Sequence, residues 1–195
     1  MSRSGTTRLV ETVVKLGGGV LTSVDVLDAV LSALHAAAQS HSLLIVPGGG
    51  PFANVVRDVD RRLGLSDAAA HWMAVLAMDQ HAHLIADRLA SAELVTEPRE
   101  IAGAIDARKI PVIAPFRWLC DADPLPHSWN VTSDSIAAWV AGRVGARRLV
   151  LVKPAGVHAA DTVVDPYFPR ALPPSVSSLI VTLDQIDQLR TALSG

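Results

Sequence analysis

The stretch VVKLGGGVL, from Val13 to Leu21, runs an apolar segment into a lysine and then into three consecutive glycines. A second stretch, LLIVPGGGPF (43–52), again ends an apolar run in three glycines. Short, continuous apolar runs that are closed by glycine or proline are typical of strands buried on both faces of a parallel sheet. The two stretches therefore predict two buried strands, each followed at once by a glycine turn.

Strand-like and helix-like segments alternate along the rest of the chain. Apolar residues recur at helical spacing in residues 23–39, 52–64, 66–90, 98–109, 132–146 and 182–193. Further strand-like runs occupy residues 92–97, 110–115, 147–152 and 177–182. This alternation predicts an α/β fold with a mostly parallel central sheet, in the form of a single-domain, three-layer αβα sandwich over residues 1–195. Residues 116–130 are rich in turn formers and aromatics, and we expect a loop there.

Composition and charge narrow the possible functions. The chain has 195 residues, a formal net charge of −2 and no basic run longer than a pair, so we expect no nucleic-acid partner. No stretch approaches the roughly 18 apolar residues of a membrane helix, and the first residues lack the features of a signal peptide. The single cysteine, Cys120, fits a reduced setting, so we expect a cytoplasmic protein without disulfides. His81 and His83 are two apart on a helix and face different sides, so we expect no metal site.

Glycine triplets after strands are suited to binding phosphate. Backbone N–H groups can approach phosphate oxygens where no side chain obstructs them, and a following helix N-terminus adds a favourable dipole. The same glycines could simply form tight turns.

Two familiar nucleotide motifs fit poorly. Lys15 precedes its glycines, whereas a Walker loop ends in Gly-Lys-Ser/Thr. Gly48, Gly50 and Ala53 match G-x-G-x-x-A, but no second strand ending in an acid follows.

The order of four motifs points to a known family. VVKLGGGVL, LLIVPGGGPFANVVR, TSDSIAAWVA and RRLVLVK follow one another as they do in the amino acid kinase family, which the chain resembles over nearly its whole length. Within that family, SDAAAHWMAVLAMDQ, SWNVTSDSIAAWVA and DPYFPRALP resemble the small kinases of methanofuran biosynthesis, which convert an aminomethyl-furan-methanol phosphate to a diphosphate. The resemblance implies a carbamate kinase-like fold, ATP and Mg²⁺ as cofactors, a small phosphorylated substrate and a homo-oligomer.

The first strand end and one helix start carry the predicted chemistry. Phosphoryl transfer between two phosphates gathers negative charge, which a lysine at a strand end can neutralise. By resemblance, Lys15 contacts the transferring phosphoryl group and Asp134 orients the active-site lysines. Without the resemblance, Lys15 would be a solvated strand end. The residues predicted to bind phosphate or ATP are Gly17, Gly18, Gly19 and Lys153.

A second set of residues is predicted to bind the substrate. These residues are Gly48, Gly49, Gly50, Arg57, Trp72, Asp79, Trp129 and Thr132. Arg57 resembles the arginine that grips the acceptor phosphate in uridylate kinases, although it could be a surface charge among its charged neighbours. Trp72 could cover a furan ring and an acid could pair with the aminomethyl cation, although an apolar helix with Trp and Met is more often core. Trp129, in or beside the 117–130 segment, could form a lid or an oligomer contact, and Thr132 could cap a helix.

Two departures from the family concern the nucleotide. After Lys153 the chain has no Val-Asp-Gly turn of the kind found in relatives, and it lacks their Gly-Gly-Met segment with its following lysine. We therefore weigh an ATP-dependent kinase for the furan phosphate against two alternatives. One is a kinase for another phosphate acceptor, such as uridylate or isopentenyl phosphate. The other is a non-catalytic protein of the same fold that binds a nucleotide or an anion.

Overall fold

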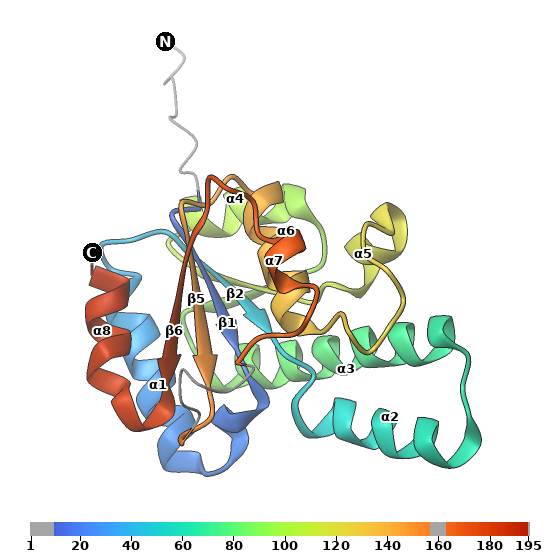
Figure 1. Cartoon of the computed structure of the whole chain (residues 1–195). Coiled ribbons are helices and arrows are strands. Elements are labelled where there is room, and N and C mark those ends of the chain that lie inside the picture. The colour runs from blue at the N-terminus through green and yellow to red at the C-terminus, as the bar shows by residue number, and fades with distance from the viewer. Residues whose placement is uncertain (1–9, 157–162, 195) are drawn as a thin grey trace.

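The computed structural model describes residues 10–156 and 163–194, and within them six strands form one sheet (Figure 1). The strands are β1 (Thr12–Leu16), β2 (Leu43–Pro47), β3 (Ala92–Val95), β4 (Ile110–Ile113), β5 (Arg148–Lys153) and β6 (Ser177–Thr182). Their order is β3-β4-β2-β1-β5-β6, and every neighbouring pair is parallel. The predicted parallel sheet is confirmed, and helices supply the crossover connections that parallel strands require.

Helices cover both faces of the sheet, as the alternation predicts. On one face lie α1 (Val24–Ala37) and α8 (Ile186–Ser194), and on the other lie α4 (Pro98–Asp106), α6 (Ser133–Arg143) and α7 (Phe168–Ala171) (Figure 1). Two 3-10 turns, η1 (Gly18–Leu21) and η2 (Leu183–Gln185), follow β1 and β6. α2 (Gly50–Leu63) and α3 (Asp67–Arg88) pack together as a long helical hairpin beside the sheet.

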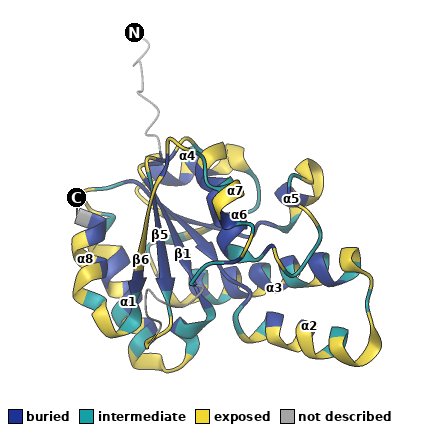
Figure 2. Cartoon of the chain, in the orientation of Figure 1, coloured by how far each residue is buried: buried dark blue, intermediate teal, exposed yellow. Residues whose placement is uncertain are grey.

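Side chains of the central strands alternate between two apolar cores. Val13 of β1 and Leu149 of β5 pack into the core beneath α6 and α4, whereas Val14 and Val150 pack into the core beneath α1 and α8. Figure 2 shows β1 and β5 buried, whereas edge strand β6 is largely exposed, as are the outer sides of the helices. Because both faces are covered, the central strands are apolar at successive positions rather than alternating with polar residues.

Residues 116–130 contain a helix where a loop is predicted. α5 spans Phe116–Ala122, and the N–H of Phe116 donates to Oδ1 of Asp79 at 3.0 Å. Trp118 is buried and its ring lies 4.8 Å from that of Trp139 on α6. The helix ends at Asp123, which has a left-handed φ of 35°. The aromatic residues that favoured a loop instead anchor this short helix, because partners distant in sequence bury them.

The strand register places the predicted phosphate-binding residues at one edge of the sheet. Leu16 of β1 pairs with Pro47 of β2 and with Val152 of β5, so these three strands end at the same level. Both glycine turns leave the sheet there, directly after β1 and β2. Ligands of open α/β sheets bind at the carboxyl ends of the strands, so this edge is where a site is expected.

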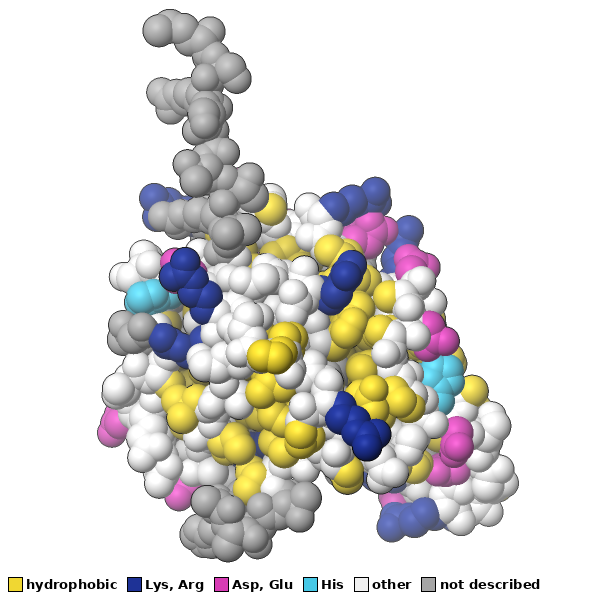
Figure 3. Space-filling view, turned by 45° about the horizontal axis from the view of Figure 1, so that its top comes forward, with side chains coloured by type: hydrophobic (Ala, Val, Ile, Leu, Met, Phe, Trp, Pro, Cys, Tyr) yellow, Lys and Arg dark blue, Asp and Glu magenta, His cyan; other side chains and the backbone are white. Residues whose placement is uncertain are grey.

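Charged side chains are spread over the surface. On the face shown in Figure 3, basic side chains stand apart, separated by apolar and uncharged groups. The longest of the described helices, α3, carries acidic, basic and histidine residues along its length. Among the residues that the structure describes, no helix has the length and apolar character needed to cross a membrane.

Candidate active site

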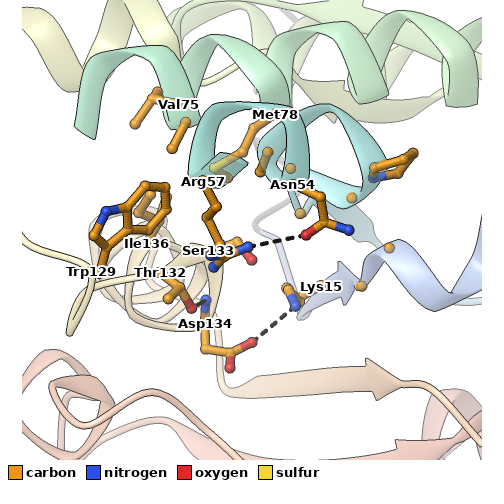
Figure 4. A pocket seen from close by; sticks show the side chains of 18 of the residues that line it. Lys15, Asn54, Arg57, Val75, Met78, Trp129, Thr132, Ser133, Asp134 and Ile136 are labelled. Atoms are coloured by element: carbon orange, nitrogen blue, oxygen red, sulfur yellow. Dashed lines mark hydrogen bonds and ion pairs between the residues drawn. The ribbon is translucent and has the colours of Figure 1, made fainter. Parts of the chain in front are cut away.

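A cavity of about 610 Å³ opens at the carboxyl ends of β1, β2 and β5 (Figure 4). Both glycine triplets line one end of it, together with Lys15, Asp134 and Lys153. The other end is formed by α2, α3, residues 128–131 and Ile136. The cavity thus contains the predicted phosphate-binding residues and most of the predicted substrate-binding residues.

Lys15, Asp134 and Lys153 form one charged cluster at the sheet end of the cavity. Nζ of Lys15 lies 3.0 Å from Oδ1 of Asp134 in an ion pair that lacks hydrogen-bond geometry. Nζ of Lys153 donates to Oδ2 of the same carboxylate at 2.5 Å. The three side chains are 7%, 5% and 11% exposed, in the order Lys15, Asp134, Lys153. Two ammonium groups on neighbouring strands are therefore held by one carboxylate, with a net positive charge beside the cavity.

The buried cluster shifts the acid–base behaviour of its members. Burial by itself would raise the pKa of Asp134, but the two lysines outweigh it and hold the pKa of Asp134 below its usual range. Burial lowers the pKa of Lys15, an effect that the ion pair with Asp134 offsets in part. Asp134 is therefore an ionised acceptor and not a proton donor at neutral pH.

The two glycine turns are in direct backbone contact. A Cβ added to Gly18 would lie 2.5 Å from the Cα of Gly50, and one added to Gly19 would lie 2.9 Å from Cγ of Pro154. Gly50 has a φ of +55°, which side-chain-bearing residues rarely adopt. In the part of the chain that the structure describes, the N–H groups of Gly18, Gly19, Gly49 and Gly50 donate to no protein acceptor. These N–H groups therefore have no acceptor within the described part of the protein.

Asp165, which the sequence analysis did not identify, holds the N-terminus of α6. Its carboxylate accepts hydrogen bonds from the N–H and Oγ1 of Thr132 at 2.9 and 2.8 Å and from the N–H of Ser135 at 3.0 Å. It also accepts from Oγ of Ser135 and from the N–H of Phe168 at 2.9 Å. Thr132 is thus a helix cap that also lines the cavity. An acid before a proline was too weak a signal to reveal Asp165 from the sequence.

Arg57 and Trp129 form one wall at the far end of the cavity. The guanidinium carbon of Arg57 lies 4.7 Å from the centroid of the Trp129 ring, and Nη1 of Arg57 donates to Oδ1 of Asn54 at 3.3 Å. Nε1 of Trp129 donates to Oδ2 of Asp60 at 2.7 Å. Figure 4 shows Arg57 reaching into the cavity from α2 with Trp129 beside it. The ring and the helix together hold the guanidinium in place.

Trp72 and Asp79, predicted to bind substrate, lie outside the cavity lining. The Trp72 ring packs edge-on against those of Phe116 and His127, and Asp79 accepts from the N–H of Phe116 as described above. Both residues serve instead to attach α5 and the following segment to α3. The reason is helical phase: Trp72 and Asp79 are two turns apart on one face of α3, and the cavity borders the neighbouring face.

A different stripe of α3 lines the cavity. It consists of Asp67, Ala70, His71, Ala74, Val75 and Met78. His71 is buried and its ring stacks on that of His127, with centroids 4.4 Å apart. Burial and His127 lower the pKa of His71 to about 4, so the ring is neutral at neutral pH. Asp67, at the exposed start of the helix, is the only carboxylate besides Asp134 among the described lining residues.

The described residues contain no group of three or more His, Cys, Asp or Glu side chains that could hold a metal ion. The carboxylate nearest the predicted phosphate site, Asp134, is already bound on both oxygens by lysines. What the site offers is therefore positive charge and backbone donors. Such groups can orient phosphates and stabilise the negative charge of a phosphoryl group in transfer.

A model of the amino acid kinase family matches residues 11–170. The chain belongs to the amino acid kinase family. It is 29% identical over 139 residues to a [5-(aminomethyl)furan-3-yl]methyl phosphate kinase from Methanocaldococcus jannaschii, a match that covers 71% of this chain and 63% of that protein. It is also 29% identical over 157 residues to a uridylate kinase from Methanothrix thermoacetophila, covering 79% of this chain and 67% of that protein. The matched region is thus about two thirds of each family relative.

Solved structures of family members share the fold. The uridylate kinase from Archaeoglobus fulgidus superposes with a TM-score of 0.73 at 17% identity, covering 95% of this chain and 96% of that one. The UMP kinase from Ureaplasma parvum gives a TM-score of 0.69 at 15% identity, with the same coverage. The predicted family and three-layer α/β fold are therefore confirmed.

Proposed function

We propose that the chain is a kinase that transfers the terminal phosphoryl group of ATP to the phosphate of a small phosphomonoester. The observation that supports this most directly is the cluster of Lys15, Asp134 and Lys153 beside two glycine turns with unpaired N–H groups. The lysines and N–H groups neutralise charge on the moving phosphoryl group. Asp134 fixes the two ammonium groups in place, so that they need no reorganisation during the reaction.

The absence of a suitable base favours a phosphate acceptor. A hydroxyl acceptor needs a group that takes its proton, whereas a phosphate oxygen is already ionised at neutral pH. Both oxygens of Asp134 face lysines, and His71, neutral and buried, belongs to the α3 stripe at the other end of the cavity. Among the described residues that line the end with the two lysines, Asp134 is the one carboxylate, and it is held by Lys15 and Lys153. An acceptor that arrives as an anion matches this end.

The residues around the first glycine turn fit the phosphates of a nucleotide. Gly17, Gly18 and Gly19 line the cavity, and side chains at these positions would collide with neighbouring backbone or with Pro154. Lys153 lies on the same side, at the end of β5. When bound, ATP supplies the phosphoryl group, and Mg²⁺ on its phosphates shields their charge. Because the described residues offer no carboxylate cluster, Mg²⁺ would be held mainly by phosphate oxygens and water.

The far end of the cavity fits an acceptor with a small apolar body. Ala70, Ala74, Val75 and Met78 present an apolar stripe, and Arg57 reaches into the cavity from α2, where its guanidinium can hold the acceptor phosphate. Asp67 adds a single negative charge, to which no described residue is paired. We therefore propose [5-(aminomethyl)furan-3-yl]methyl phosphate as the acceptor, with its ring on the apolar stripe and its ammonium group near Asp67. The relative from Methanocaldococcus jannaschii is a kinase for this compound.

A coupled assay of ADP release tests this proposal. The purified chain is incubated with Mg-ATP and, in turn, the furan phosphate, UMP and isopentenyl phosphate, beside the variants Lys15→Ala and Lys109→Ala. Lys109 is an exposed lysine at the opposite, amino-terminal edge of the sheet, before β4, and serves as the matched control. We expect acceptor-dependent ADP release that is fastest with the furan phosphate and is lost only in Lys15→Ala. If ADP is released faster with UMP, the proposed acceptor becomes uridylate instead of the furan phosphate. If the chain binds ATP but releases no ADP with any acceptor, the proposal that it is a kinase is wrong.

A further inference from the structure

His81 lies beneath the second glycine turn, completely buried within α3. Its Nδ1 is 2.6 Å from the carbonyl oxygen of Gly48. A carbonyl oxygen only accepts hydrogen bonds, so Nδ1 carries the proton and donates it. The other ring nitrogen, Nε2, is buried without a partner among the described residues. Burial lowers the pKa of His81, and so does nearby Lys15, so the ring is neutral with a single N–H that is spent on Gly48.

This hydrogen bond fixes the peptide between Gly48 and Gly49. The N–H of Gly48 donates to the carbonyl of Leu16 at 2.7 Å, which attaches the start of the turn to β1. The carbonyl of Gly48 is then held toward His81. In a trans peptide the C=O and the following N–H point in opposite directions, and the described residues contain no cis peptide bond. The N–H of Gly49 therefore points away from His81, and Gly49 lines the cavity.

His81 also supports the contact between the two glycine turns. A Cβ added to Gly50 would lie 3.7 Å from Nδ1 of His81 and 3.4 Å from the Cα of Gly18. The side of Gly50 that would carry a side chain is therefore turned toward both the His81 ring and the first turn. The His81 ring thus packs beside the place where the two turns meet.

We propose that His81 is a positioning residue that aims the N–H of Gly49 at a phosphate in the cavity. Its bond to the Gly48 carbonyl prevents the peptide from rotating to an orientation in which the carbonyl oxygen would repel the phosphate. The His81 side chain has no exposed surface, so it cannot contact the substrate and acts only through the glycine turn. This role rests on the proposed function only in that the cavity binds a phosphate.

Two substitutions separate this role from simple packing. His81→Leu keeps a side chain of similar size but removes the donor. His81→Asn is smaller but can place an amide N–H near the position of Nδ1. The matched control is His83→Leu, on the exposed side of the same helix two residues further on. If His81 only filled space, Leu would be tolerated better than Asn.

Kinetics with the acceptor that reacts gives the first readout. We expect His81→Leu to lower kcat at least about tenfold with little change in KM. The reason is that an N–H of Gly49 that no longer points at the phosphate stabilises the transition state less than before, and ground-state binding depends on it less. His81→Asn should recover kcat to within about threefold of the wild type, although it leaves a cavity in the core. Unchanged kcat in His81→Leu, or an Asn variant no better than Leu, would overturn the proposal.

Amide NMR gives a readout that does not depend on turnover. Inorganic pyrophosphate is titrated into ¹⁵N-labelled protein while the Gly49 amide is followed. We expect a downfield shift of the Gly49 proton in the wild type and in His83→Leu, and loss of that shift in His81→Leu. A Gly49 amide that does not respond in the wild type would overturn the proposal. Because this test needs no acceptor, it stands even if no kinase activity is found.

Discussion

The two ends of the cavity are built in different ways. The proposed transfer end is made mainly from strand ends and backbone: Lys15 and Lys153 lie on adjacent strands, both glycine turns begin where a strand stops, and Asp134 at the start of α6 pairs with both lysines. The proposed acceptor end is made from side chains of the α2–α3 hairpin, of residues 128–131 and of Ile136, and it includes Arg57 and Trp129. Sheet register fixes the first end, whereas contacts between distant segments fix the second. This difference suggests that the transfer end serves any phosphate acceptor and that the acceptor end selects among them.

Replacing Lys15 tests whether the transfer end is indifferent to the acceptor. We expect Lys15→Met to lower kcat at least about 100-fold, because a cation aimed at the moving phosphoryl group is lost. The factor should be similar for every acceptor that reacts, with KM changing only a few-fold. Steady-state kinetics with two acceptors measures this, with Lys109→Met as the control. A loss confined to one acceptor would show that Lys15 belongs to the selective end instead.

Asp134 links the transfer end to stability. Asp134→Asn leaves two lysines near each other without a counter-charge, and we expect the free energy of unfolding at pH 7 to fall by about 3 kcal/mol. The pKa of Asp134 is lowered in the folded state, so its stabilising effect is complete above the unfolded value of 3.8 and is lost as the pH falls below it. Urea unfolding of both proteins between pH 7 and pH 3 measures the difference. A difference that stays constant down to pH 3 would show that charge on Asp134 is not its source.

Arg57 should affect acceptor binding more than transfer. We expect Arg57→Ala to raise the KM for the acceptor at least about tenfold, because a charged hydrogen bond to its phosphate is lost. The KM for ATP should change little. Trp129→Phe keeps a ring beside Arg57 but removes the bond to Asp60, and we expect a smaller increase of about two- to fivefold. Arg61→Ala, an exposed arginine of the same helix, is the control. An equal rise in KM for ATP and for the acceptor would show that Arg57 does not bind the acceptor specifically.

Asp67 gives the smallest and most selective effect. We expect Asp67→Asn to lower kcat/KM for the furan phosphate about three- to tenfold, since a partly solvated ion pair with the ammonium group is lost. An analogue with a methyl group in place of the aminomethyl group should react equally with both proteins. Competition of the two compounds in one reaction gives the ratio directly. A ratio that is the same for wild type and variant would show that Asp67 does not recognise the amine.

The same contrast explains what the sequence could predict. The glycine triplets were predicted because strand ends and glycine turns are local patterns that a single chain displays, whereas the role of Lys15 came from the resemblance to the family. Arg57 lies in the cavity lining, and its role in binding the acceptor stays a prediction. The Trp129 ring beside it is held by a hydrogen bond to Asp60, 69 positions away in the sequence. Such contacts have no local signal. The fold itself followed from alternating segments whose type needs only nearby residues.

The errors have a common physical cause. Trp72 and Asp79 were assigned to the acceptor pocket because of their residue types, whereas the phase of α3 turns Asp67 and His71 toward the cavity instead. His81 was considered only as a metal ligand and rejected, and nothing in the sequence places it under Gly48. Asp165 contacts Thr132 and Ser135, and α5 is held by Asp79, and each of these contacts joins residues at least 30 positions apart. Tertiary packing, rather than helix propensity, determines which side of a helix borders a cavity.

The most direct test of the account is phosphorus NMR of the wild type with Mg-ATP and the furan phosphate, beside Lys15→Met. It distinguishes phosphoryl transfer to an existing phosphate from simple hydrolysis of ATP, which ADP release alone does not. The account predicts two new coupled phosphorus signals from a diphosphate ester, formed as ATP is consumed and absent in the variant. ATP consumed only to ADP and orthophosphate, or a signal from phosphate attached to the amine, would contradict it.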